Sequence, residues 1–281
     1  MKSTLKFSFY FLMVAVCFIE ACSGVDADKS KSNKTSKKDS VDEKSKLTLQ
    51  ETHNVLDSLD TTFYVYLTFD DGPYHTTPSL TKFLDEKQLK SSFFVIGSQI
   101  DYTHYYDSVY HSVKNNPLFR VYNHTYTHAV TKGRIHKYYA DPNTVYQDFT
   151  KNKKFLPDAA HITRLPGTNA FRIGSYEWPT NKAGKRVIAF LDSIHSNEVL
   201  FGWDVIWETK QSRDTSGVNK MLQQMLDYKS SKNKYHNHCV ILFHDYFFNT
   251  PKSLENLNYL IGLLKNKYHC VFRWASEFPG V

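Results

Sequence analysis

The sequence predicts an α/β fold in which strands and helices alternate along one domain. Short apolar runs rich in β-branched and aromatic residues recur from residue 64 onward, as in buried parallel strands. Stretches with apolar residues at helical spacing separate these runs. The alternation favours a parallel sheet with helices outside it, closed into a barrel. In such folds the working residues lie at the carboxyl ends of the strands.

Each element follows from its local pattern. Strands are expected at residues 64–69, 92–96, 119–122, 186–190, 199–203, 239–243 and 269–274. Helices are expected at residues 78–86, 218–228 and 254–264, where apolar residues share one face. Polar clusters follow several of the strands, so these clusters are the first candidates for functional residues.

The first 22 residues are expected to be a signal peptide. Two lysines precede an apolar run over residues 7–19, which is too short for a stable membrane anchor. Ala21 before Cys22 resembles the cleavage box of bacterial lipoproteins, in which the cysteine is acylated. Glu20 is unusual in that box, so ordinary cleavage near Ala21 is the alternative. We expect an exported protein, anchored to the membrane of the bacterial cell envelope through lipidated Cys22.

Residues 23–50 contain almost no large apolar side chains, so they are expected to form a disordered tether. Residues 51–281 are then expected to form one folded domain. The formal net charge is +7, but lysines are scattered among acids and no nucleic-acid motif is present. Within the domain, Cys239 and Cys270 lie in apolar runs, so a disulfide and two buried free thiols are both open.

Residues 65–73 end a predicted strand with two adjacent carboxylates, in the order Val-Tyr-Leu-Thr-Phe-Asp-Asp-Gly-Pro. Side chains alternate in direction along a strand, so Asp70 and Asp71 are expected to have different roles. One can hold a metal while the other faces a substrate water. Asp-Asp-Gly-Pro is also favourable turn chemistry, which is the purely structural alternative.

His124 and His128 are four residues apart, a spacing that on a helical turn places both imidazoles on one face. An aspartate and two histidines leave open positions for water and substrate, as a catalytic metal site requires. Arg164 can hold a carboxylate, and the Pro166-Gly167 turn after it can present a backbone amide. His244 ends another predicted strand and is suited to proton transfer near neutral pH.

Four ordered motifs resemble those of the polysaccharide deacetylases, also called NodB-homology domains or family 4 carbohydrate esterases. These motifs are Thr68-Phe-Asp-Asp-Gly-Pro73, His124-Thr-Tyr-Thr-His128, Arg164-Leu-Pro166 and Leu242-Phe-His244. The resemblance covers about residues 63–276. It implies a distorted (β/α) barrel, TIM-barrel-like with fewer than eight regular repeats.

The resemblance also implies residue roles. Asp71, His124 and His128 match the metal ligands, usually for zinc, and Asp70 matches the general base that deprotonates the attacking water. His244 matches the general acid that protonates the leaving group.

Two further positions match supporting roles in the family. Arg164 matches the residue that orients the base, and Leu242 matches the apolar wall around the acetyl methyl group.

The sequence departs from the family pattern in two places. After Pro166 the family usually has an aromatic residue, whereas here Gly167 follows, whose amide remains a candidate oxyanion donor. The fourth motif is irregular, with Trp203 or Trp207 as the sugar-facing ring. Asp204, with Glu208 as the alternative, is expected to orient His244.

The expected function is a metal-dependent hydrolase that removes N-acetyl groups from an N-acetylhexosamine polysaccharide, such as peptidoglycan or an exported glycan. One divalent metal ion, in first place zinc, is the expected cofactor, and an acetylated polysaccharide is the expected partner. Removal of O-acetyl groups from a xylan-type polysaccharide is one alternative. A catalytically weak polysaccharide-binding lipoprotein is the other.

Overall fold

A computed structural model describes residues 61–129, 135–156 and 161–281. The expected signal peptide and tether lie outside the described residues and stay predictions, as does the start of the domain at residue 51. Within the described ranges, no helix is both long enough and apolar enough to cross a bilayer.

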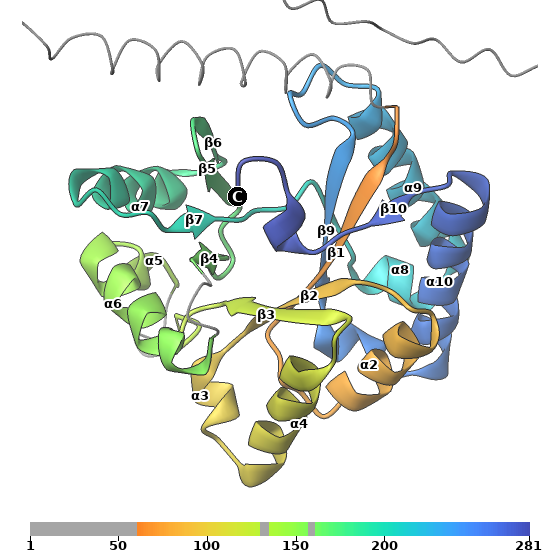
Figure 1. Cartoon of the computed structure of the whole chain (residues 1–281), viewed down its shortest axis with the longest axis horizontal. Coiled ribbons are helices and arrows are strands. Elements are labelled where there is room, and N and C mark those ends of the chain that lie inside the picture. Colours follow the sequence, from red (N-terminus) through yellow and green to blue (C-terminus); the bar gives the residue numbers. More distant parts are fainter. Residues whose placement is uncertain (1–60, 130–134, 157–160) are drawn as a thin grey trace, which may run out of the picture. The chain divides into compact units, whose positions relative to one another are not determined.

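One ten-stranded mixed sheet forms the centre of the domain, and it curls so that the helices cover its outer side (Figure 1). The order is β6-β5-β7-β4-β3-β2-β1-β9-β8, with β10 beside β1. The pairs are parallel except those of β5 with β6 and β7. The strands are β1 (Tyr64–Asp70), β2 (Ser91–Val95), β3 (Phe119–Asn123), β4 (Ile162–Thr163), β5 (Ala170–Ile173), β6 (Tyr176–Pro179), β7 (Val199–Leu200), β8 (Val205–Ile206), β9 (His238–His244) and β10 (Val271–Phe272).

Helices separate most of the strands, as the sequence predicts, but β4, β5 and β6 follow one another without a helix, as do β7 and β8. The α-helices are α2 (Thr77–Glu86), α3 (Gly97–Ile100), α4 (His104–Asn115), α5 (Ile135–Tyr138), α6 (Pro142–Asn152), α7 (Lys182–Ser193), α8 (Thr209–Arg213), α9 (Thr215–Lys229) and α10 (Pro251–Gly262). Short 3-10 or π segments are η2 (Lys153–Phe155), η3 (Asp245–Phe248), η4 (Leu263–Lys267) and η5 (Ala275–Glu277). The predicted distorted (β/α) barrel is therefore confirmed.

Three predicted strands are wrong or too long. Residues 186–190 lie in α7, where Val187, Ile188 and Leu191 are buried at helical spacing. The run at 199–203 contains only β7, because the carbonyls of Phe201 and Gly202 accept hydrogen bonds from a buried arginine side chain instead of a strand. The run at 269–274 contains only the two residues of β10.

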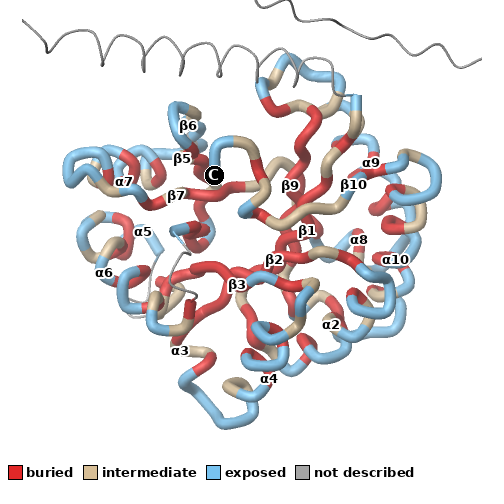
Figure 2. The backbone as a smooth tube through the Cα atoms, viewed as in Figure 1, coloured by how far each residue is buried: buried red, intermediate tan, exposed pale blue. Residues whose placement is uncertain are grey.

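The two faces of the central strands have different surroundings. On β1, Val65, Leu67 and Phe69 pack in a large core shared with α2, α4, α9 and α10. The alternate residue Tyr66 packs on the inner side with aromatic rings such as Phe201 and Phe278. Figure 2 shows the strands as a mostly buried centre with exposure concentrated on the outer helices and loops. Burying each large apolar side chain contributes roughly 1.5–3 kcal/mol.

The strand register brings the polar residues of the inner face together. Asp70 at the end of β1 is paired with His244 at the end of β9. On the other side, Asn123 at the end of β3 is paired with Thr163 of β4. Because parallel strands end at the same edge of a sheet, the residues that follow these four strands converge there. Cys239 and Cys270 are buried free thiols, which decides the alternative left open by the sequence.

Candidate active site

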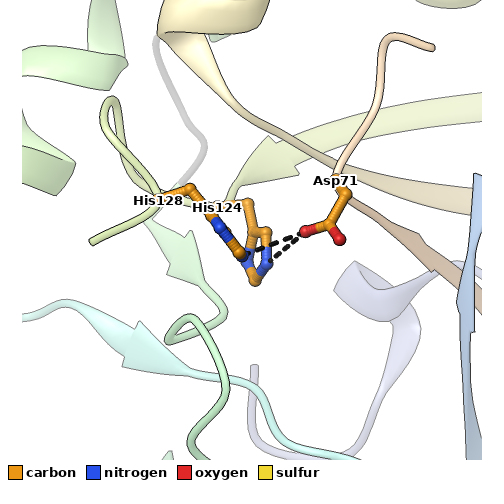
Figure 3. Close-up of side chains that lie close together, drawn as sticks. All are labelled: Asp71, His124 and His128. Atoms are coloured by element: carbon orange, nitrogen blue, oxygen red, sulfur yellow. Dashed lines mark ion pairs between the residues drawn. The ribbon is translucent and has the colours of Figure 1, made fainter. Parts of the chain in front are cut away.

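The two aspartates at the end of β1 face different partners, as strand alternation predicts. Asp70 is buried and its Oδ1 accepts a hydrogen bond of 2.8 Å from Arg164 Nη1. Asp71 has a φ of 72°, in the left-handed region that a non-glycine residue adopts at a cost. Its carboxylate points toward the rings of His124 and His128 (Figure 3).

Asp71, His124 and His128 form the one group among the described residues with the arrangement of a metal site. Asp71 Oδ1 lies 3.3 Å from His124 Nε2 and 3.0 Å from His128 Nε2. Ligand atoms about 2.1 Å from a tetrahedral ion would lie about 3.4 Å apart. Asp71 Oδ1 is buried and receives no well-aligned hydrogen bond from a described residue. A divalent cation therefore fits the donor set.

The charges of this cluster support one another. Burial alone would raise the pKa of Asp71, but the adjacent His124 and His128 imidazoles outweigh it and hold that pKa well below its ordinary value. Burial would lower the pKa of His124, but Asp70 and Asp71 outweigh it and raise that pKa. Without a cation the carboxylates thus favour a charged imidazole at the same place.

The predicted helical turn under the two histidines is wrong, because these residues form a loop after β3. Thr125, His128 and Ala129 have φ values of 66°, 51° and 61°, which no α-helix contains. Asn123 Oδ1 accepts from Thr125 N, and Thr125 Oγ1 accepts from His128 N. These short bonds curl the loop so that both rings face the same point.

His124 is oriented by a backbone carbonyl. Its Nδ1 lies 2.9 Å from the carbonyl oxygen of Arg164, the residue that follows β4. With the proton on Nδ1, this bond leaves Nε2 free to face Asp71. Parallel pairing of β3 with β4 therefore sets the orientation of a metal-facing ring.

Asp148 of α6 fixes the next part of the same loop, and sequence reasoning missed it. Both oxygens of its buried carboxylate accept from Thr127 N, at 3.1 and 3.2 Å, and one also accepts from Thr127 Oγ1 at 2.8 Å. Tyr138 Oη donates to the same carboxylate at 3.0 Å. Helix α6 thereby holds the loop at Thr127, between His124 and His128. An acidic residue on an otherwise amphipathic helix carries no local signal of this contact.

Arg164 is fully buried and its guanidinium is held on several sides. Besides Asp70, it donates to Thr68 Oγ1 at 2.7 Å, to the Phe201 carbonyl at 2.9 Å and to the Gly202 carbonyl at 2.8 Å. These contacts place Arg164 where the family resemblance expects it, beside Asp70.

His244 closes the other side of the site. Its Nε2 lies 4.0 Å from Asp71 Oδ2, and its Nδ1 is buried without a hydrogen-bond partner among the described residues. Burial lowers the pKa of His244. Asp70 and Asp71 raise this pKa, whereas His124 and Arg164 lower it, and the net shift is downward. The ring is therefore placed to exchange a proton at the cluster.

The expectation that Asp204 orients His244 is wrong. Asp204 Oδ2 accepts from Val240 N at 2.8 Å, four residues before His244 on β9. Burial raises the pKa of Asp204 to about 7. Glu208 is exposed and caps α8, so it does not replace Asp204 at His244.

The expectation that Trp207 faces a sugar is also wrong. Its ring is fully buried against Phe243 and Phe248, and its indole nitrogen donates to Ser212 Oγ. This ring is therefore part of the apolar core between β9 and the outer helices. Trp203 is only partly buried and lies near Arg164, with 5.9 Å between the guanidinium carbon and the ring centroid.

The remaining predicted residues are Leu242, Pro166 and Gly167. Leu242 is buried two residues before His244 on β9, so both side chains lie on the same side of the strand. The Pro166 carbonyl accepts from Tyr139 Oη, which holds the turn. Gly167 is exposed with a φ of 57°, and its N–H donates to no described residue.

Asp245 is a second residue that sequence reasoning missed. It is fully buried next to His244, and Thr77 Oγ1 donates to its Oδ2. A Cβ on Gly72 would lie 2.6 Å from the same Oδ2, so the glycine permits this approach. Burial raises the pKa of Asp245 to about 7, and the nearby charges of Asp71 and Asp70 contribute to this rise. The hydrogen bond from Thr77 acts in the opposite direction and lowers the pKa. The buried carboxyl thus supports the turn that follows Asp70 and Asp71.

Comparisons with known proteins agree with this arrangement. The family model described as polysaccharide deacetylase matches residues 60–186. The catalytic domain of a peptidoglycan N-acetylglucosamine deacetylase from Eubacterium rectale is similar in structure, with 20% identity and a TM-score of 0.54 over 77% of this chain and 90% of that one. The Bc1960 peptidoglycan N-acetylglucosamine deacetylase has 20% identity and a TM-score of 0.51 over 76% and 87%.

A family 4 pseudoenzyme from Bacillus anthracis shares the fold as well, with 17% identity and a TM-score of 0.50 over 75% of this chain and 64% of that one. A search of curated proteins gives no match. At these identities the solved structures support the fold alone. The segment that matches the family model contains β1, β3 and β4 with their polar ends. The chain therefore shares the fold of these deacetylases, and its residues 60–186 are similar to the polysaccharide deacetylase family.

Proposed function

We propose that this protein removes N-acetyl groups from an N-acetylhexosamine-containing polysaccharide, with one divalent ion as cofactor. The observation that carries the proposal is the division between two neighbouring carboxylates. Asp71 faces the two imidazoles, whereas Asp70 is held by Arg164 with its Oδ2 3.6 Å from His124 Nε2. One carboxylate is thus suited to the cation, and the other is left beside it as a base.

Asp71, His124 and His128 would hold the ion, and these nitrogen and oxygen donors suit zinc. When bound, such an ion lowers the pKa of water and polarises the acetyl carbonyl. Both effects help amide hydrolysis, because neutral water is a weak nucleophile and the transition state carries a developing oxyanion.

The protein side chains would handle the protons. Asp70 accepts a proton from the attacking water while the hydrogen bond from Arg164 keeps its carboxylate oriented. The water oxygen bonds to the carbonyl carbon, and the free N–H of Gly167 is the candidate donor to the oxyanion. His244 then donates a proton to the sugar nitrogen as the C–N bond breaks. Acetate and a free amine are the products.

Two alternatives keep the same fold. Cleavage of O-acetyl esters would need the same base and a less demanding acid, because an alkoxide leaves more readily than an amide nitrogen. A binding protein without turnover is the other alternative, and the pseudoenzyme neighbour demonstrates that this fold alone does not establish activity.

Acetate release decides between these possibilities. The protein is assayed with zinc on N-acetylglucosamine oligomers and on O-acetylated xylan, beside Asp70→Asn. We use Asp227→Asn, an exposed carboxylate that accepts from Gln223, as the matched control. Faster release from the amide substrate, lost only in Asp70→Asn, supports the proposal. Release from xylan alone would identify an esterase, and binding of either glycan without release would identify a binding protein.

We further propose export and lipid anchoring through Cys22, on the basis of the amino-terminal sequence pattern. Incorporation of labelled palmitate into the full chain in a bacterial host tests this placement. A Cys22→Ser variant should take up no label. Equal labelling of both forms would contradict the anchor.

A further inference from the structure

An aromatic cluster lies beside His244, where the segments after β1 and β9 meet. We call its residues Tyr74, Tyr246 and Phe247 the aromatic rim. The ring centroid of Tyr246 lies 5.2 Å from that of His244 and 6.2 Å from that of Tyr74. Phe247 lies 5.9 Å from His244 and 4.6 Å from Tyr246. The rim therefore adjoins the proposed general acid directly.

The rim is accessible to solvent, although it borders the core. Tyr246 is 38% exposed, and Tyr74 and Phe247 are partly buried. Phe247 packs against the large core and anchors the rim, whereas the Tyr246 hydroxyl donates to no described residue. An exposed ring held on a partly buried neighbour offers a fixed apolar face at little entropic cost.

A cavity of about 400 Å³ adjoins the rim, between the start of α10 and the end of α8. Two aromatic residues of the rim, Tyr246 and Phe247, line it together with polar residues. The polar residues are Thr209, Ser212, Arg213, Asn249 and Thr250. Arg213 is exposed. A pyranose ring has matching chemistry, with apolar C–H faces and hydroxyl groups at its edge.

Of the aromatic rings that the family resemblance leads one to expect, only Trp203 is present and partly exposed. Gly167 stands where the family usually has an aromatic ring, and Trp207 is fully buried. The aromatic rim is thus an accessible ring surface in direct contact with His244 that the family motifs do not include.

We propose that the aromatic rim and the adjoining cavity form a subsite for a further sugar ring of the substrate polymer, next to the ring whose acetamide is hydrolysed. The inference rests on the proposed function and adds the requirement for an oligomeric substrate. Stacking on Tyr246 would hold the polymer while His244 protonates the leaving nitrogen.

Binding measurements on the full domain in the Asp70→Asn background test the subsite without turnover. The probes are N-acetylglucosamine and its pentamer, followed by ligand-observed NMR. Tyr246→Ala should weaken pentamer binding by about tenfold and monomer binding by less than about threefold. Tyr246→Phe, which keeps the ring, should restore pentamer binding. Tyr259→Ala, also 38% exposed but on α10 and outside the cavity wall, is the matched control.

The ratio of the two affinities carries the result, because a folding defect would weaken both probes together. An unchanged pentamer-to-monomer ratio in Tyr246→Ala would overturn the subsite while leaving the proposed function intact. Failure of the Asp70→Asn protein itself to bind the pentamer would contradict the proposed function and the subsite with it.

Discussion

Arg164 Nη1 donates to Asp70 Oδ1 at 2.8 Å, and the two side chains are 0% and 3% exposed. The same guanidinium is held by one hydroxyl and two backbone carbonyls, so its position is determined independently of Asp70. A buried ion pair of this kind fixes the direction of the carboxylate, which is what a general base requires.

Arg164→Lys should therefore damage both activity and stability. An ammonium group cannot reproduce the planar fork of donors, and Asp70 would become a poorly paired buried charge. We expect acetate release to fall by about 100-fold and the free energy of unfolding by about 3–5 kcal/mol, measured by steady-state kinetics and urea denaturation. Arg120→Lys, whose guanidinium bonds two carbonyls near the surface, is the control and should change neither. Wild-type activity in Arg164→Lys would rule out the orienting role.

Asp148→Ala should weaken metal binding although Asp148 does not face the metal site. Its carboxylate holds Thr127, which lies between the two histidines, so the variant loosens the ligand loop. Groups that orient metal ligands contribute about 10- to 100-fold in affinity. Zinc affinity is measured by chelator competition, with Asp227→Ala as the exposed control. Unchanged affinity would show that the loop holds its geometry without α6.

Gly72→Ala should destabilise the turn through Asp245, because the new Cβ would approach Asp245 Oδ2 to 2.6 Å. We expect a loss of about 2 kcal/mol in unfolding free energy. In an Asp245→Ala background, where the opposing oxygen is absent, the same change should cost much less. A double-mutant cycle by chemical denaturation measures this coupling. Additive effects would mean that the close approach does not restrain the turn.

The raised pKa of Asp204, about 7, predicts how stability depends on pH. The unfolded carboxyl ionises near pH 4, so between about pH 4 and 7 the folded state binds more protons than the unfolded state. The Asp204 contribution therefore favours folding at low pH and is lost as pH rises to 7, by at most about 4 kcal/mol. Asp204→Asn should flatten this decline in urea titrations. An identical slope in both proteins would contradict the assignment.

The sequence predicted the residues that end apolar runs better than those that act across the fold. Asp70 and His244 could be placed because each follows a strand pattern, and parallel strands end at one edge. Asp148 and Asp245 could not, because their partners Thr127 and Thr77 come from other elements and leave no local signal.

Local patterns also failed where tertiary contacts decide. The histidine spacing suggested a helical turn, but bonds from Asn123 and Thr125 curl the segment into a loop. Trp207 and Trp203 are equally plausible sugar-facing rings in sequence, yet packing against Phe243 buries only the former completely. Which side of a short segment meets the core depends on neighbours distant in the chain.

The proposed function requires that Asp71, His124 and His128 hold a divalent ion during deacetylation. Acetate release from N-acetylglucosamine pentamer before chelation, after chelation and after zinc is restored tests it most directly. We predict that activity is lost on chelation and returns with zinc, and that His128→Ala shows no such recovery. Undiminished release by the fully chelated protein, with metal content confirmed to be negligible, would contradict the account.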